Sequence, residues 1–246
     1  MASVLYVGHA TTLIELDGVR LLTDPLLRTH VGHLKRLVPL GETPAPPDAV
    51  LLSHLHNDHL DIPSLRRLGQ RTRLLVPRGG GGLLRRQGFL GVEELSEGGT
   101  AYVSGVGITA VPAVHDGRRY PVGKQIPALG YTVAGSRTLY FAGDTDFFEG
   151  MSELAGVDAA LLPISGWGAR VGPGHLDPAG AAEALRVLEP RVAIPIHWGT
   201  YAPWHWRLTR HETSLREPEV AFADAAASVA PDVDVRILRP GERTEF

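Results

Sequence analysis

The chain has 246 residues, a formal charge of −3 and 43% hydrophobic residues, which is enough to form the core of one large α/β domain. The chain has no long run of Lys or Arg, so nucleic acid is not the expected partner. The absence of cysteine excludes disulfides, thiolate metal ligands and a cysteine nucleophile. Without an apolar run of 18 residues or a signal-peptide pattern, we expect no transmembrane segment and a cytoplasmic location.

The first part of the sequence predicts a strand-rich meander. Strand-like runs cover 4–7, 13–16 and 19–23, and Asp17-Gly18 is a type I′ turn signal between the last two, so we expect a β-hairpin. The stretch 26–40 mixes apolar and basic residues without periodicity, and we interpret it as a mobile flap. A buried strand at 49–52 and a helix at 62–68 follow.

Later segments alternate strands with helices. We expect strands at 73–77, 101–103, 107–111, 131–134, 138–142, 157–162 and 192–196, and helices at 83–87, 178–188 and 219–227. The glycines at 79–82 lack the following Lys-Ser/Thr of a phosphate loop and predict a flexible turn. This order predicts one α/β (α+β) domain over residues 1–246, with antiparallel and mixed sheets and outer helices, as in a four-layer αβ/βα sandwich.

The segment Ser53-His54-Leu55-His56-Asn57-Asp58-His59 carries the densest chemical signal, directly after a predicted buried strand. Alternate residues of an extended chain face the same side, so His54 and His56 can converge on one ion. The chain then turns toward a helix, which allows Asp58 and His59 to face a second ion. A single histidine is usually an ordinary core or surface residue, but burying four uncoordinated polar groups is costly. The segment therefore predicts a metal site.

Three further candidates each follow a predicted strand: His115, Asp144 and His197. Side chains at the ends of several strands can meet in one crevice, and Gly143 allows a sharp turn before Asp144. Taken singly, each is readily explained as a turn residue, but together they extend the predicted site. Imidazole and carboxylate donors suit Zn²⁺, and also Mn²⁺ or Fe.

These motifs resemble the metallo-β-lactamase superfamily. Four segments resemble the branch with N-acylphosphatidylethanolamine-hydrolysing phospholipase D and the ascorbate-6-phosphate lactonase-like proteins: Gly8-His9-Ala10-Thr11, Leu22-Thr23-Asp24-Pro25, Gly174-His175-Leu176-Asp177-Pro178 and Ile196-His197-Trp198-Gly199-Thr200. The resemblance spans about residues 4–205 and implies the four-layer metallo-β-lactamase fold. It also implies two divalent ions, preferably Zn²⁺, one bound by His54, His56 and His115, the other by Asp58, His59 and His197, and both by Asp144.

The resemblance implies a hydrolase in which a metal-bridging hydroxide attacks a small-molecule phosphodiester, lactone or ester. Asp58 and Asp144 would orient the water. His175 could be a leaving-group acid, a substrate contact or a polar residue at a helix start. His9 and Asp24 could hydrogen-bond the metal ligands or serve local turns.

Two groups of residues near the motifs leave alternatives open. Arg118 and Arg119 could clamp a phosphate or carboxylate, or form a solvated loop pair. A later aromatic cluster could form an apolar substrate wall, cap the core or build a homo-oligomer interface; it comprises Trp198, Tyr201, Trp204 and Trp206. The remaining histidines are expected to be ordinary loop or surface residues: His30, His33, His205 and His211.

Two other functions are compatible with the superfamily. An RNA-processing nuclease is disfavoured by the acidic charge balance and the absence of a basic arm. A mononuclear iron oxidoreductase is disfavoured by the second complete set of metal ligands.

Overall fold

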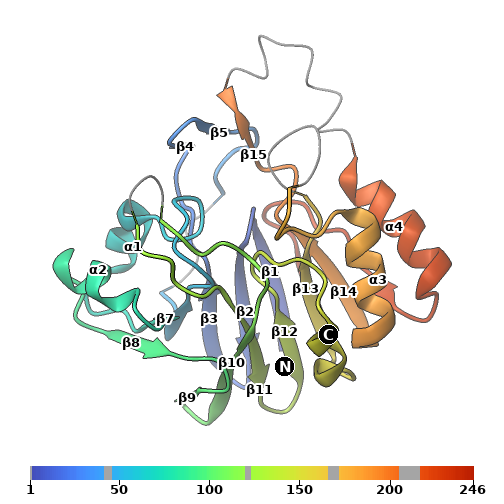
Figure 1. Cartoon of the computed structure of the whole chain (residues 1–246), viewed down its shortest axis with the longest axis horizontal. Coiled ribbons are helices and arrows are strands. Elements are labelled where there is room, and N and C mark those ends of the chain that lie inside the picture. Colours follow the sequence, from blue (N-terminus) through green and yellow to red (C-terminus); the bar gives the residue numbers. More distant parts are fainter. Residues whose placement is uncertain (1, 42–45, 120–122, 166–171, 205–216) are drawn as a thin grey trace.

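The computed structural model describes residues 2–41, 46–119, 123–165, 172–204 and 217–246. Within these ranges the chain forms two seven-stranded sheets and one three-stranded sheet. In Figure 1, α1 and α2 lie on one side of the molecule and α3 and α4 on the other, with the strands of the large sheets between them. The four-layer αβ/βα sandwich with two mixed sheets, predicted from the sequence, is confirmed.

The first sheet has the order β17-β1-β2-β3-β6-β7-β8. Its strands are β1 (Ala2–Gly8), β2 (Thr11–Leu16), β3 (Val19–Thr23), β6 (Ala49–Leu51), β7 (Leu74–Pro77), β8 (Val92–Leu95) and β17 (Arg243–Glu245). β17, β1, β2 and β3 pair antiparallel, whereas β3, β6, β7 and β8 pair parallel. The predicted hairpin is confirmed: Leu16 pairs with Val19, and Asp17 and Gly18 both have positive φ, as a type I′ turn requires.

The second sheet has the order β16-β14-β13-β12-β11-β10-β9. Its strands are β9 (Thr100–Val103), β10 (Val106–Pro112), β11 (Leu129–Ala134), β12 (Thr138–Phe141), β13 (Ala159–Pro163), β14 (Val192–Ile196) and β16 (Asp234–Val235). β9 to β12 pair antiparallel, and β12, β13, β14 and β16 pair parallel. The sequence pattern predicts the central strands but not the edge strands β8, β16 and β17, because such short segments give no clear periodicity.

Successive residues of the central strands enter different cores. Leu51 and Leu161 pack between the two sheets, whereas Val50 packs toward the side of α1 and α2 and Leu162 toward α3 and α4. Because both faces of each sheet are covered, these strands are apolar at every position instead of alternating. The continuous apolar runs in the sequence have this cause.

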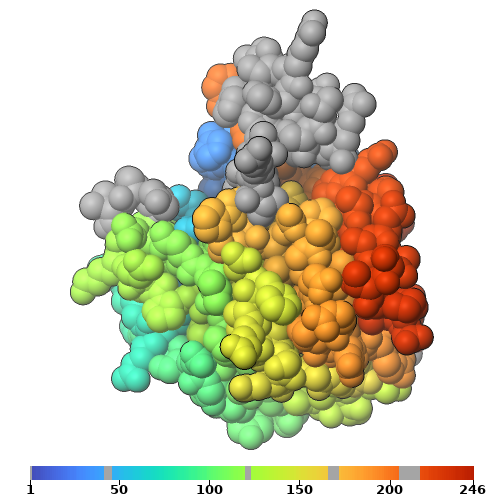
Figure 2. Space-filling view, turned by 45° about the vertical axis from the view of Figure 1, so that its right-hand side comes forward, coloured from blue at the N-terminus to red at the C-terminus, as the bar shows by residue number. Residues whose placement is uncertain are grey.

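The outer helices are α1 (Ile62–Leu68), α2 (Gly81–Arg86), α3 (Pro178–Leu188) and α4 (Pro218–Val229), and a 3₁₀ helix, η1 (Glu149–Leu154), precedes β13. α1 and α3 have the predicted bounds. Their N-caps, Asp61 and Asp177, accept hydrogen bonds from Ser64 N and Gly180 N at 3.0 and 2.7 Å, which satisfies free amides of the first turn. α2 already begins within the glycine run, so the predicted flexible turn is wrong for its second half. In Figure 2, the orange and red residues of α3 and α4 cover one side of the molecule.

The stretch 26–40 contains regular structure that the sequence pattern does not predict. It forms β4 (His30–Val31) and β5 (Leu34–Arg36), and β5 pairs antiparallel with β15 (Tyr201–Pro203). Leu26, Val31, Leu34 and Tyr201 form a small separate core. The sequence does not reveal this sheet because the partner of β5 lies 165 residues later in the chain. No helix among the described residues is long and apolar enough to cross a membrane.

The strands that precede the candidate site residues run in one direction within each sheet. These are β1, β3 and β6 in the first sheet and β10, β12 and β14 in the second. Their carboxyl ends therefore lie at a common edge of each sheet, which is where parallel strands form binding crevices.

The edges of the two sheets touch at Gly143, just after β12. Gly143 has a φ of +61°, and a Cβ atom there would lie 2.5 Å from Ser53 Cβ and 2.9 Å from Ser53 Oγ, just after β6. Glycine is therefore required both for the left-handed backbone and for the contact.

A pair of alanine substitutions separates these two requirements. Gly143→Ala should lower the free energy of unfolding by about 1–3 kcal/mol more than Gly156→Ala. Gly156 also has a left-handed backbone, with a φ of +80°, but nothing lies within 4 Å of a Cβ added there, so only its backbone would be strained. Urea unfolding of the metal-free proteins measures both values. Equal losses would contradict the steric argument.

Candidate metal centre

The sequence-predicted site residues converge at the edge shared by the two sheets. Each follows one of the strands described above, except His175, which precedes α3. The structure brings together His9, Asp24, His54, His56, Asp58, His59, His115, Asp144, His175 and His197. No member of the predicted set lies elsewhere.

The first cluster contains His54, His56 and His115, with one nitrogen of each within 4.8 Å of the others. His54 is fully buried, and its Nε2 has no hydrogen-bond partner. His115 Nδ1 donates to Gly174 O at 2.7 Å, and His115 Nε2 lies 3.2 Å from His56 Nδ1. Three imidazoles thus face one point.

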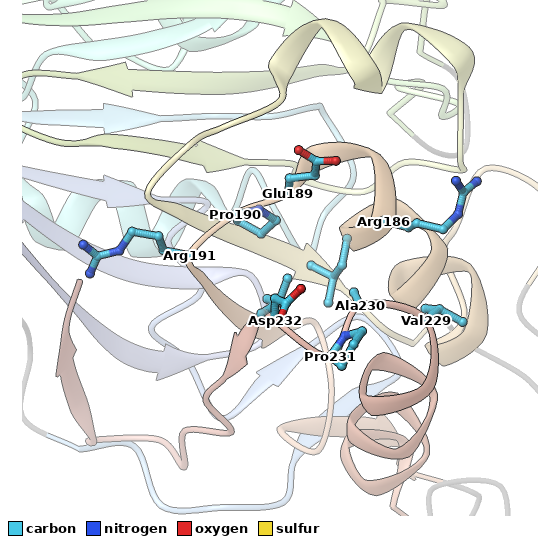
Figure 3. Close-up of a pocket in the computed structure, with 10 residues that line it drawn as sticks. Arg186, Glu189, Pro190, Arg191, Val229, Ala230, Pro231 and Asp232 are labelled. Carbon is cyan, nitrogen blue, oxygen red and sulfur yellow. The ribbon is translucent and has the colours of Figure 1, made fainter.

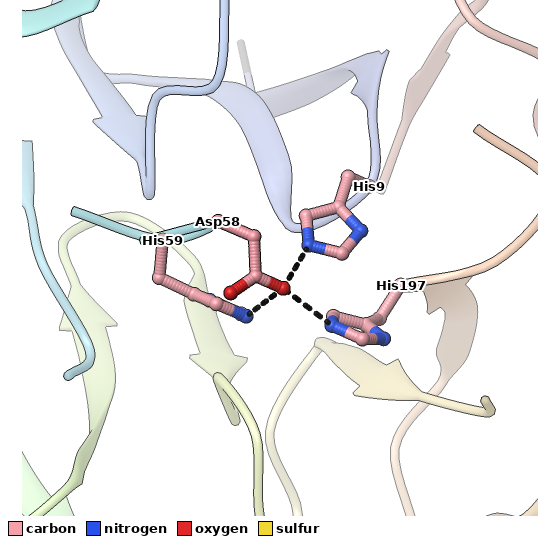
Figure 4. Close-up of side chains that lie close together, drawn as sticks. All are labelled: His9, Asp58, His59 and His197. Atoms are coloured by element: carbon pink, nitrogen blue, oxygen red, sulfur yellow. Dashed lines mark hydrogen bonds and ion pairs between the residues drawn. The ribbon is translucent and has the colours of Figure 1, made fainter. Parts of the chain in front are cut away.

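The second cluster surrounds the carboxylate of Asp58 (Figure 4). Asp58 Oδ2 lies 3.1 Å from His9 Nε2, 3.7 Å from His59 Nε2 and 3.9 Å from His197 Nε2. Burial lowers the pKa of His9 to about 3, so its neutral ring donates to Asp58 at neutral pH. The sequence places His9 near the ligands, and the structure places it in contact with Asp58.

The carboxylate of Asp144 lies between the clusters. Its Oδ2 is 3.2 Å from His59 Nε2, 3.4 Å from His197 Nε2 and 3.6 Å from His175 Nε2. Asp144 and His175 also share a possible metal-binding group with His115 of the first cluster. Asp144 Oδ1 is buried and has no hydrogen-bond partner, which is rare for a carboxylate oxygen without a ligand.

A chain of hydrogen bonds fixes how His54 and His59 are oriented. Asp24 is fully buried, and it accepts from Ser53 N at 2.8 Å, from Ser53 Oγ at 2.5 Å and from His59 Nδ1 at 2.7 Å. Because the Ser53 hydroxyl donates to Asp24, its oxygen accepts from His54 Nδ1 at 2.9 Å. Both rings therefore bond to these partners through Nδ1 and direct Nε2 toward the cluster.

Two carbonyls orient the rings of His115 and His197 in the same way. His115 Nδ1 donates to Gly174 O at 2.7 Å, and His197 Nδ1 donates to Ser165 O at 2.9 Å. The sequence identifies the candidate ligands but not these carbonyl partners, because a backbone oxygen leaves no mark in the residue type.

His9 and His197 lie on two turns that hold each other. Both have a left-handed backbone, with φ of 60° and 61°, which costs about 1–2 kcal/mol for a residue with a Cβ atom. His197 N donates to His9 O at 2.8 Å, and His9 N donates to Thr200 Oγ1 at 2.8 Å. These bonds stabilise the strained turns and bring the two rings to a centroid distance of 4.0 Å. Thr200 is the last residue of the sequence motif His197-Trp198-Gly199-Thr200, and this motif is the sequence signal from which its role could have been predicted.

Buried charges of opposite sign are coupled across the site. Burial lowers the pKa of His59, but Asp144, Asp58 and Asp24 together outweigh this effect and raise that pKa well above its ordinary value. Burial raises the pKa of Asp144, but the neighbouring imidazoles outweigh it and hold that pKa well below its ordinary value. The three carboxylates thus favour a positive charge between them, on His59, and a divalent cation would supply such a charge as well.

The donor set and its geometry fit divalent metal ions. The buried Nε2 of His54 and Oδ1 of Asp144 lack hydrogen-bond partners, and buried polar atoms of this kind call for a ligand. Imidazole and carboxylate donors suit Zn²⁺ and other first-row metals.

Two arginines of the His115 loop behave differently from a phosphate clamp. Arg119 Nη1 donates to Leu55 O at 3.0 Å and to Leu60 O at 2.9 Å, and Arg118 Nη2 donates to Gln125 Oε1 at 3.0 Å. Nη1 of Arg119 therefore binds backbone carbonyls of the 54–60 loop.

The aromatic cluster divides between the interior and the surface. Trp198 is buried, stacks on Tyr6 at a centroid distance of 6.3 Å, and donates from Nε1 to Pro195 O at 2.9 Å. Tyr201 is buried as well, whereas Trp204 is 56% exposed. Trp198 and Tyr201 thus belong to the core, not to a substrate wall. Of the remaining residues, His30 and His33 are exposed as expected; His205, Trp206 and His211 lie outside the described residues.

A pocket of about 240 Å³ lies beside the second cluster. Its lining combines the turn between β4 and β5 with the loop that follows β6: Val31, Gly32, His33, Leu34, His56, Asn57 and Asp58. A further pocket, of about 500 Å³, lies between the ends of α3 and α4, with Arg186 and Arg191 on opposite sides (Figure 3). None of the lining residues of this second pocket belongs to the histidine and aspartate clusters, so we assign no catalysis to it.

Comparison with known proteins agrees with this geometry. The family model for the β-lactamase superfamily domain matches residues 19–198. A UPF0173 metal-dependent hydrolase of Methanopyrus kandleri is 36% identical over 98% of this chain and 99% of its own length. An N-acyl-phosphatidylethanolamine-hydrolyzing phospholipase D of Caenorhabditis elegans is 31% identical over 80% of this chain and 63% of its own length.

Among solved structures, the metallo hydrolase Igni18 of Ignicoccus hospitalis is similar to the whole chain. It has a TM-score of 0.75 and 26% identity, and the match covers 100% of this chain and 98% of that one. The chain therefore belongs to the metallo-β-lactamase superfamily and is a metal-dependent hydrolase of that superfamily.

Proposed function

We propose that the protein is a binuclear hydrolase that cleaves a phosphodiester, lactone or ester bond of a small molecule. The observation that carries the proposal is the position of Asp144, whose carboxylate lies between two clusters of candidate ligands. A carboxylate placed there can contact two ions at once, and an oxygen without a hydrogen-bond partner is available for this.

The two clusters fit two ions with distinct ligands. In this proposal His54, His56 and His115 would hold one ion, Asp58, His59 and His197 would hold the other, and Asp144 would serve both; the side chains of each set lie close together. Zn²⁺ is the proposed metal because imidazole nitrogens and carboxylate oxygens are its usual ligands, although the same donors also bind Mn²⁺ and Fe.

The protein's own residues supply the remaining chemistry. When bound, divalent ions supply Lewis-acid chemistry, which lowers the pKa of a water and offsets negative charge at the attacked atom. The carboxylates of Asp58 and Asp144 would accept hydrogen bonds from the attacking water and orient it. His175 is only partly buried and lies 3.6 Å from Asp144, where it can donate a proton to the leaving group. The pocket beside Asn57 holds the rest of the substrate.

The likeness to a phospholipase D supports a phosphodiester as the bond. The same arrangement of ligands also serves attack on a carbonyl carbon, so a lactone or ester remains within the proposal. The bond is therefore decided by assay.

Elemental analysis of the purified protein, with rate assays before and after chelation, tests the proposal. Bis(p-nitrophenyl) phosphate and a small panel of lactones serve as substrates. We expect two metal ions per chain and cleavage that the chelator abolishes. Protein with one ion or none, together with no cleavage, would refute a binuclear hydrolase.

Substitutions in each cluster should remove one ion. His56→Ala in the first cluster and His59→Ala in the second should each lower the metal content from two ions toward one. Each should reduce hydrolysis by at least about 100-fold, because Lewis-acid stabilisation is worth several kcal/mol. The matched control is His30→Ala, which removes an exposed histidine outside the clusters. Unchanged metal content in the cluster variants would rule out this ligand assignment.

The role of His175 predicts a dependence on the leaving group. His175→Gln should keep two ions per chain but slow the cleavage of alkyl phosphodiesters or esters by about 100-fold to 10,000-fold. Cleavage of p-nitrophenyl substrates should change much less, because p-nitrophenolate leaves without protonation. Values of kcat for the two substrate types give the comparison, and an equal loss for both would contradict a general-acid role.

A further inference from the structure

The proposed ligands His56, Asp58 and His59 lie on a loop between β6 and α1 that contains no helix or strand. Within it, the amides of His59 and Leu60 both donate to His56 O, at 3.2 and 2.8 Å. Because both bonds end on one carbonyl, they fix the middle of the loop but not its spacing from the neighbouring elements.

Arg119 connects the two ends of this loop. Its Nη1 donates to Leu55 O at 3.0 Å and to Leu60 O at 2.9 Å. These two carbonyls flank residues 56–59 on either side, and the Arg119 side chain is half-buried. One guanidinium nitrogen therefore holds both ends of the ligand-bearing segment.

Arg119 also belongs to the loop of another proposed ligand. It follows His115 by four residues, while Leu55 and Leu60 lie 64 and 59 residues before it in the chain. His56 and His115 come from these two loops and must approach within about the same distance of one ion. A bond between the loops fixes that separation.

We propose that Arg119 is a positioning residue of the metal centre, which sets the distance between the 54–60 loop and His115. The proposal rests on the proposed function, in that it takes these histidines as ligands. A guanidinium is planar and always charged, and charge-assisted hydrogen bonds to carbonyls are the stronger kind. Without it, two carbonyls would lose their partner and the loop could shift. Comparable losses around metal ligands weaken metal binding about 10-fold to 100-fold.

The test is metal affinity, measured with Zn²⁺ alone in competition with a chromophoric chelator. Metal-free Arg119→Ala and Arg119→Gln should bind Zn²⁺ about 10-fold to 100-fold more weakly than the parent protein. Arg119→Lys should lie in between, because an ammonium keeps the charge but not the planar fork. Methylguanidinium added to Arg119→Ala should restore part of the affinity. Arg66→Ala is the control: it removes an exposed guanidinium on α1 that bonds to Gln87, and it should bind like the parent.

The outcomes separate this inference from the proposed function. A parent protein that binds no Zn²⁺ would overturn both. A parent that binds Zn²⁺, with a folded Arg119→Gln that binds it equally well, would overturn the role of Arg119 alone. An unchanged Zn²⁺ affinity together with a higher KM for anionic substrates only would make Arg119 a substrate clamp and would also overturn it. Circular dichroism of the metal-free variants establishes that they are folded, and Arg119→Gln replaces Arg119→Ala if the latter is not.

Discussion

An ionised carboxylate that is removed from water must find compensating charge, and Asp144 meets this constraint at the centre of the protein. It is 2% exposed, and isolation there would cost far more than a marginally stable domain can tolerate. His59, whose pKa the surrounding carboxylates raise, lies 3.2 Å from it, and the rings of His175 and His197 lie within 3.6 Å. These imidazoles are themselves buried or partly buried and depend on the carboxylates in return. The charged groups of the site therefore depend on one another, and bound cations would add to the compensation.

The scaffold supplies the stability that this set requires. Both sheets bury apolar residues on both faces, and apolar burial is the dominant favourable contribution to folding. The strands that precede the candidate ligands end at one edge, so the polar residues are concentrated there and the cores are apolar. Strained turns at His9 and His197 are held by their mutual backbone hydrogen bond. In this way a rigid sandwich can hold a locally unfavourable but chemically useful arrangement.

The functional centre extends beyond the residues that can touch a metal. Asp24, Ser53 and the carbonyls of Gly174 and Ser165 bind Nδ1 of His54, His59, His115 and His197. This directs Nε2 of these four rings into the site before any ion arrives, which reduces the cost of assembling the site. Substitutions of Asp24 or Ser53 should therefore act on metal affinity more than on the rate of the hydrolytic step.

The sequence alone determined what depends on neighbouring residues: the hairpin at Asp17-Gly18, the bounds of α1 and α3 set by Asp61 and Asp177, the apolar central strands and the His-x-His-x-Asp-His segment. Tertiary structure alone decided what depends on distant partners. β5 pairs with the distant strand β15, and buried Trp198 stacks on Tyr6. Arg119 donates hydrogen bonds to carbonyls about 60 residues earlier in the chain. A local sequence pattern records the conformational preferences of the residues and the spacing of the apolar ones. A hydrogen bond from a side chain to the carbonyl of a distant segment leaves no trace in either segment. For this reason the candidate ligands and two of their hydrogen-bond partners, His9 and Asp24, could be predicted from the sequence, but the carbonyls that orient His115 and His197 could not.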